Sequence, residues 1–138
     1  MHKHIFAIII FILHSTSVLA EPHFVGYFEA KPDFGGAVNR ICIKQLPDSY
    51  LDVAIATSYC PSKECMNARI DGLWFQSKLN TKSINYSSPS CKLKVQFTKS
   101  GAKITHSANC RDEDHPYLYA NGSYKYIKSE FNQDRCGP

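Results

Sequence analysis

Residues 91–110 read CKLKVQFTKSGAKITHSANC, two runs of alternating apolar and polar residues enclosed by two cysteines. Such alternation predicts strands that bury one set of side chains and expose the other. The break at Ser100-Gly101 predicts a two-residue turn, so the two runs are expected to pair as an antiparallel hairpin. In this register Phe97 faces Ile104, and the apolar residues of both runs lie on one face.

The same register places Cys91 opposite Cys110. Directly opposed Cβ atoms lie ~4.5–5.5 Å apart, close to the separation that a disulfide requires. We therefore predict a Cys91–Cys110 bond that staples the hairpin and takes no part in chemistry. His106 falls opposite Val95 on the inward face, where a hydrogen-bonded structural histidine is more common than a metal ligand.

The remainder of residues 21–138 consists of similar short runs separated by turn residues. This is the pattern of one all-β domain, which we expect to be a small antiparallel β-barrel or sandwich of about seven or eight strands. Pro47-Asp48 suits a type I turn between two strands, and Gly72 suggests a bulge within a longer one. The other expected strands cover residues 24–30, 37–46, 50–58, 68–79, 82–88 and 117–128.

Residues 1–20 have the three-part pattern of a secretory signal peptide. A basic start, MHKH, precedes the apolar run IFAIIIFIL at 5–13, and small residues close the segment at Val18 and Ala20. The apolar run is about half of the ~20 residues that a membrane helix needs. We expect cleavage after Ala20, a periplasmic or secreted protein, and no membrane span in residues 21–138.

All of the cysteines lie after the expected cleavage site. An even number of them in a small exported domain predicts a disulfide framework, although six cysteines allow 15 connectivities. The segment CPSKEC at 60–65 lacks the C-x-x-C spacing of a metal knuckle or a thiol oxidoreductase, so a Cys60–Cys65 bond is the simpler expectation. Cys42–Cys136 then remains by elimination.

The chain has a formal charge of +4, or +3 once Lys3 leaves with the leader, and we judge its charged residues to be spread along the sequence. A weak positive charge favours anionic partners only slightly. Basic runs of the kind that bind nucleic acid are absent from the sequence, so no nucleic-acid partner is expected.

The second half of the chain contains, in order, C-x-L-x-[FV]-x-F, a second cysteine and G-[ST]-Y-[KR]. On this motif, residues 68–127 resemble a group of small exported bacterial proteins of unassigned function, in which the last strand closes a small sheet or barrel. The resemblance favours one strand with a glycine bulge over 117–128, although Asn121-Gly122 also suits a type I′ hairpin. The matching positions are Cys91, Leu93, Val95, Phe97, Cys110, Gly122, Ser123, Tyr124 and Lys125.

The size, leader and β-rich pattern are also loosely similar to those of the bacterial periplasmic lysozyme inhibitors. Those inhibitors present a loop built around S-x-S-G-x-x-Y, of which this chain has only Ser100-Gly101. Animal lysozymes are strongly basic, so an inhibitor gains from being acidic. The positive charge of this chain and the missing serine and tyrosine argue against lysozyme as the target.

Two groups of side chains are candidates for a site. The loop CRDEDHP contains Asp112, Glu113, Asp114 and His115, which could hold a hard cation or an acid–base pair, although a solvated loop is the simpler explanation. The second group is aromatic and could line a protein or glycan contact, although half-buried tyrosines are also natural on a sheet. Its members are Trp74, Tyr117, Tyr119, Tyr124 and Tyr126.

The sequence contains no G-x-S-x-G, H-E-x-x-H or glycine-rich phosphate-binding loop, so we predict no catalytic residue, cofactor or metal site. We expect a non-enzymatic binding protein of the cell envelope, whose partner is a protein or a cell-wall glycan. Inhibition of a cell-wall hydrolase or immunity against an effector is one such role. A small secreted enzyme with a site hidden from sequence, or a structural or adhesion component, is the alternative.

Overall fold

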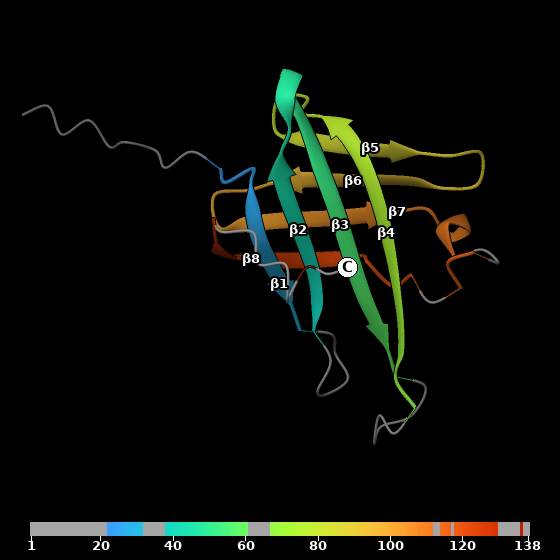
Figure 1. Cartoon of the computed structure of the whole chain (residues 1–138). Helices are drawn as coiled ribbons and strands as arrows, with labels where there is room; N and C mark the ends of the chain where they lie inside the picture. The colour runs from blue at the N-terminus through green and yellow to red at the C-terminus, as the bar shows by residue number, and fades with distance from the viewer. Residues whose placement is uncertain are drawn as a thin grey trace, which may run out of the picture.

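The described part of the chain folds into one antiparallel sheet of eight strands (Figure 1). The computed structural model describes residues 22–31, 38–60, 67–111, 114–116, 118–129 and 136. The strands are β1 (Gly26–Ala30), β2 (Asn39–Gln45), β3 (Tyr50–Tyr59), β4 (Arg69–Lys78), β5 (Ser83–Ser87), β6 (Lys92–Phe97), β7 (Gly101–His106) and β8 (Gly122–Lys128). Their order across the sheet is β4-β3-β2-β1-β8-β7-β6-β5. The all-β prediction is confirmed.

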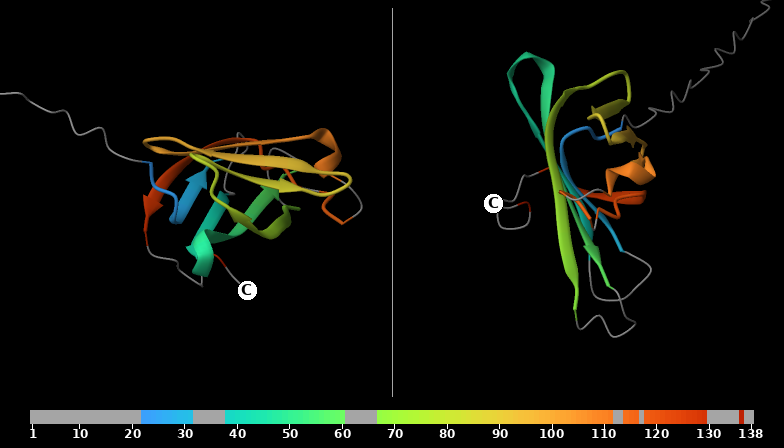
Figure 2. Two further views of the ribbon diagram at one scale, coloured as in Figure 1. Left: turned by 90° about the horizontal axis from the view of Figure 1, so that it is seen from above. Right: turned by 90° about the vertical axis from the view of Figure 1, so that its right-hand side faces the viewer.

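The sheet curls into a nearly closed barrel. Strands β1–β4 and β5–β8 form two layers that cross over a shared core (Figure 2). The sheet ends at β4 and β5, which form no ladder with each other in the described residues. A tight turn nevertheless joins them, because Asn80 and Ser83 exchange backbone hydrogen bonds of 2.8 and 2.9 Å. None of the helical segments in the described part of the chain has the length and apolar character that a membrane span requires.

The interior is filled by the apolar half of each alternating strand. In β6, Leu93, Val95 and Phe97 are buried, while the residues between them are exposed. Burying one such side chain stabilises the fold by about 1.5–3 kcal/mol. The alternation therefore both selects the strands and supplies the core. The largest fully buried members of the core are Phe28, Ile41, Ile43, Leu51, Val53, Ile55, Ile84, Val95, Ile104 and Leu118.

The hairpin of β6 and β7 forms as predicted, but the predicted register is wrong by two residues. Phe97 pairs with Ala102 and not with Ile104. The turn falls one residue earlier than expected because Thr98 closes it. The Thr98 N–H donates to the carbonyl oxygen of Gly101 at 2.8 Å, and Thr98 Oγ1 accepts the Gly101 N–H at 3.1 Å. A shift of two residues keeps the same side chains inside, because side chains alternate with a period of two.

The predicted Cys91–Cys110 disulfide is confirmed, with its Cα atoms 4.3 Å apart. In the observed register a straight strand would carry Cys110 past Cys91. A 3₁₀ turn over Ala108–Cys110 brings the chain back instead. Ser107 fixes this turn, because its N–H donates to the Lys92 carbonyl at 3.0 Å and its carbonyl accepts the Cys110 N–H at 3.1 Å.

The predicted Cys42–Cys136 disulfide is also confirmed, with its Cα atoms 5.8 Å apart. Cys42 lies on the outer face of β2, directly across from Tyr27 of β1. Both side chains are buried together with Cys136. The bond therefore fixes residue 136 against the outside of the barrel. The predicted Cys60–Cys65 bond includes Cys65, which lies outside the described residues.

Three local predictions are wrong. Gly72 forms no bulge, because it pairs regularly with Ala56 in the β3–β4 ladder. The turn after Pro47 is not type I, because Asp48 adopts a left-handed φ of 59°. The last strand begins only at Gly122, so this glycine lies at a strand end and forms neither a hairpin turn nor a bulge within 117–128.

A polar network holds residues 118–120 beside the start of β2 and the end of β3. Asn39 is only 6% exposed, and its Nδ2 donates to the carbonyl oxygen of Tyr119 at 3.1 Å. Asn39 Oδ1 accepts the Ser58 N–H at 2.9 Å. The Tyr124 hydroxyl donates to the carbonyl oxygen of Ala120 at 2.8 Å. The buried polar groups of this region thus have partners, as stable interiors require.

Burial raises the pKa of Tyr124 above its ordinary value of 10.0, and Asn39 acts weakly in the opposite direction. Above about pH 10 the folded state therefore binds more protons than the unfolded state, and the free energy of unfolding falls by up to about 1.4 kcal/mol per pH unit. Tyr124→Phe should remove this contribution and flatten the decline. Urea unfolding at about pH 9, 10 and 11 checks it, and parallel curves for the two proteins would contradict it.

Candidate functional site

Trp74 is the one predicted contact residue that the structure places fully on the surface, with 55% of its area exposed. It lies on the outer face of β4, opposite Ala54 of β3. Its Nε1–H donates to Oδ1 of Asp52 at 2.6 Å. Because Asp52 lies diagonally across β3, this bond holds the indole over the neighbouring strand.

Those predicted tyrosines that the structure describes do not join Trp74 in one surface. Tyr124 is 3% exposed and belongs to the core, so its predicted place on a binding surface is wrong. Tyr126 is half-buried and stacks on His23 with ring centroids 3.8 Å apart. Tyr119 is half-buried and stacks on Tyr59 at 4.7 Å. Tyr117 lies outside the described residues.

The predicted acidic loop is only partly described, because Asp112 and Glu113 lie outside the described residues. His115 Nδ1 lies 3.3 Å from Oδ1 of Asp71, so this pair ties the loop to β4. Sequence reasoning missed the pair because 44 positions separate its members. In the described ranges, no three histidine, cysteine, aspartate or glutamate side chains gather as a metal-binding group.

The outer face of β5–β8 carries positive charge alone. These four strands contain no aspartate or glutamate. Their exposed charged residues form no ion pair with any other described residue. We call these four residues the lysine track: Lys92, Lys94, Lys103 and Lys125.

The lysine track runs diagonally over three strands. Lys92 and Lys94 are two residues apart on β6, a step of about 7 Å. Lys103 of β7 lies diagonally beyond Lys94, and Lys125 of β8 lies diagonally beyond Lys103. Diagonal neighbours in a sheet are about 7–8 Å apart. Since every step advances in the same direction, the four charges stand in single file over roughly 20 Å.

The outer face of β1–β4 differs because its charges are mixed. Glu29 pairs with Arg40 across β1 and β2, and Asp52 pairs with Lys44 across β2 and β3. Opposite charges in such positions compensate each other. Glu29 also faces Lys125 of β8, so opposite charges first stand next to each other at the Lys125 end of the lysine track.

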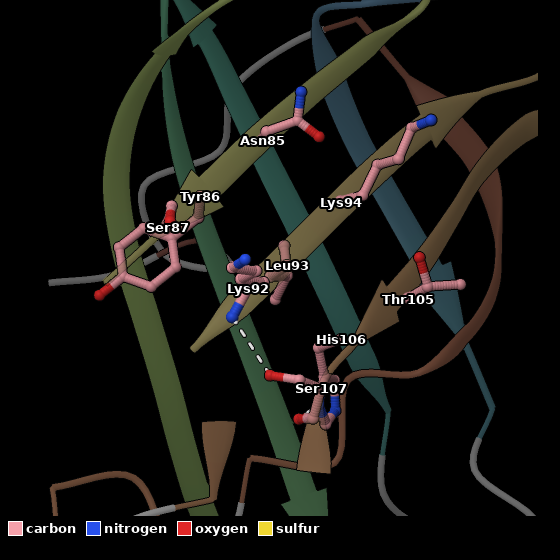
Figure 3. A pocket seen from close by; sticks show the side chains of 9 residues that line it. All are labelled: Asn85, Tyr86, Ser87, Lys92, Leu93, Lys94, Thr105, His106 and Ser107. Carbon is pink, nitrogen blue, oxygen red and sulfur yellow. Dashed lines mark hydrogen bonds between the residues drawn. The ribbon is translucent and has the colours of Figure 1, made fainter. Parts of the chain in front are cut away.

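A hollow of about 400 Å³ opens beside the first two lysines of the track (Figure 3). This volume falls within the ~300–1,000 Å³ that is usual for ligand pockets. No residue of β1–β4 lines the hollow, and six of its nine lining residues are exposed ones, so it lies on the outer side of the β5–β8 layer. It is lined by Asn85, Tyr86, Ser87, Lys92, Leu93, Lys94, Thr105, His106 and Ser107.

His106 lies at the β7 end of this hollow and is half-buried. Its Nδ1 lies 2.8 Å from the carbonyl oxygen of Ser107, and its backbone N–H donates to Oδ1 of Asn121 at 2.6 Å. Its Nε2 is buried and has no hydrogen-bond partner in the described part of the chain.

Sequence reasoning missed the lysine track because it averaged the charge over the chain. Residues 72–111 contain six lysines and one arginine but no acidic residue, so the judgement that charges are evenly spread is wrong. The alternation of β6 and β7 already assigns Lys92, Lys94 and Lys103 to the outer face. The signal was therefore present in the sequence as a local absence of acidic residues.

Comparisons of the chain with protein-family models, with curated proteins and with solved structures found no match. The functional interpretation therefore depends on the geometry of the chain itself. Among the described residues, the lysine track with its hollow and, on the other layer, the exposed indole of Trp74 are two surfaces open to a partner.

Proposed function

We propose that this protein is an exported, non-enzymatic binding protein of the cell envelope that binds an anionic partner through the lysine track. The basis is the charge of β5–β8, which present lysines and no acidic residue on their outer face. Like charges that stand side by side repel one another, and an anionic partner relieves this repulsion. The leader-like residues 1–20 and the disulfides support export, because disulfides persist in oxidising compartments.

The scaffold supports binding because it holds the lysine backbones at fixed positions. Lys92, Lys94 and Lys103 lie on β6 and β7, whose far ends the Cys91–Cys110 bond joins. Only the lysine side chains then lose freedom when a partner binds, which limits the entropy lost. Rigid spacing also favours partners whose anions repeat at matching distances.

An inhibitor or immunity protein is a special case of this proposal. A hydrolase or effector that presents an acidic surface would be attracted to the lysine track, whereas a strongly basic lysozyme would be repelled. The same face would thus select among targets by charge.

The proposal predicts that residues 21–138 bind soluble polyanions, with polygalacturonate and poly-L-glutamate as probes, and do not bind neutral dextran. Lys92→Gln/Lys94→Gln should weaken polyanion binding about tenfold, because each exposed charge contributes up to about 1 kcal/mol. The affinity should also fall linearly with the logarithm of the NaCl concentration, with a shallower slope for the variant. Isothermal titration calorimetry measures both quantities.

The matched control is Lys44→Gln/Lys78→Gln, which removes the same net charge from exposed positions on β2 and β4. It should change the affinity less than twofold, an effect near the lower limit for surface charges. Trp74 is the single tryptophan and lies on the other layer, so its fluorescence should stay constant on binding. Equal losses in the two double variants, or no binding by the unmodified chain, would show that the lysine track is not the site.

A further inference from the structure

We propose that the anionic partner is a linear acidic polysaccharide that lies along the lysine track, an inference that rests on the proposed function above. The first reason is the single file of charges. Four lysines at steps of about 7–8 Å present a line about 20 Å long and one residue wide. A chain with an acidic group on successive sugar units matches a line, whereas a compact anion would contact only one or two of these lysines.

The second reason is the kind of polar group beside the lysines. Asn85 and Ser87 flank the track on β5, and Thr105 flanks it on β7. Hydroxyl and amide groups both donate and accept hydrogen bonds, as the hydroxyl groups of a sugar do. A carboxylate-rich peptide surface is mainly an acceptor and would leave their acceptor capacity unused.

The third reason is the lack of apolar anchors on this face. Among the residues of β5–β8, Ile127 is the only large apolar residue that is exposed, with 42% of its area accessible. Protein interfaces depend on buried aromatic or arginine anchors, and peripheral membrane binding depends on inserted apolar side chains. Ile127 is a single aliphatic residue at the Lys125 end of the lysine track and is neither an aromatic nor an arginine anchor, which favours a polysaccharide over an acidic protein or an anionic lipid surface.

The hollow beside Lys92 and Lys94 supplies a place for one sugar unit. The aliphatic stems of the two lysines provide its apolar portion, and Asn85 and Thr105 provide hydrogen-bonding groups at its sides (Figure 3). A sugar unit seated there places its acidic group near the two lysines. The units that follow then reach Lys103 and Lys125 in turn.

The length dependence of binding tests this geometry. Galacturonate oligomers should bind residues 21–138 more tightly as they lengthen, until they span the track. Beyond that length, each doubling of the oligomer length should raise the affinity less than twofold. Polygalacturonate should bind at least tenfold more tightly than poly-L-glutamate of equal charge, and than vesicles of phosphatidylcholine and phosphatidylglycerol. Lys94→Gln/Lys103→Gln, in the middle of the file, should shorten the oligomer length at which the affinity reaches its plateau.

The control variant is again Lys44→Gln/Lys78→Gln, which should leave both the plateau length and the preference unchanged. Poly-L-glutamate or the vesicles could bind as tightly as polygalacturonate and lose affinity in Lys94→Gln/Lys103→Gln. That result would overturn the polysaccharide as the partner and would retain the proposal that the partner is anionic. Affinity that does not depend on oligomer length would overturn the linear arrangement. Absence of binding to every polyanion would overturn the proposed function itself.

Discussion

Cys42→Ala/Cys136→Ala should lower the free energy of unfolding by about 4.7 kcal/mol, the largest loss that we expect from a change at the surface of the barrel. The bond joins residues 94 positions apart, so its removal frees most of the chain in the unfolded state. A loss of this size is a large fraction of the free energy of unfolding of a typical domain. Urea unfolding followed by circular dichroism measures the difference.

The matched comparison is Cys91→Ala/Cys110→Ala, whose bond joins residues only 19 positions apart. Its removal should lower the free energy of unfolding by about 3.3 kcal/mol, because loop entropy grows with the logarithm of loop length. The two variants should therefore differ by about 1.4 kcal/mol in the stated order. The opposite order would show that strain or packing at the bonds, and not chain entropy, decides their contributions.

Gly101→Ala is the second change with a large expected effect. A Cβ atom at this position would overlap the backbone carbonyl oxygen of Tyr124 in β8. The obstacle is backbone, so it can move only if the β7–β8 ladder shifts. We expect a loss of about 3 kcal/mol or more, at the upper end of the range for overpacking. Urea unfolding measures this loss, and amide exchange of β8 shows whether the ladder opens.

Gly72→Ala provides the matched control, because Gly72 also lies within a regular strand. Its added Cβ would lie 3.0 Å from the carbonyl oxygen of Ile55, a close contact that small adjustments relieve. Alanine also favours a strand over glycine, so the net change should stay within about 1 kcal/mol. A loss at Gly101 no larger than the loss at Gly72 would refute the close approach of β7 and β8.

The strands could be predicted from sequence because alternation is a local property. Leu93, Val95 and Phe97 alternate with polar residues, and burial of the apolar set follows from that pattern alone. The register of the hairpin could not be predicted, since a shift of two residues satisfies the same alternation. The observed register is fixed by Thr98, whose hydroxyl closes the turn, and by Gly101, because the β8 backbone lies too close for a side chain at this position.

The disulfide of this hairpin was predicted correctly from a register that was wrong. The turn over Ala108–Cys110 compensates for the shift and returns Cys110 to Cys91. Agreement at one pair of residues is therefore weak support for the pairing of a whole strand. The lysine track shows the converse, because its residues were visible in the sequence but their common face required the pairing of three strands.

The meeting of β1 with β8 also sets the order in which the barrel can assemble. Tyr27 and Phe28 pair with Lys128 and Tyr126, so the first strand finds its partner only when the last strand is present. Contacts between such distant segments form slowly, whereas the hairpin of β6 and β7 is local. The Cys42–Cys136 bond needs residue 136 as well. The native barrel consequently closes only when nearly the whole chain is available, and the oxidation of Cys91 with Cys110 can precede it.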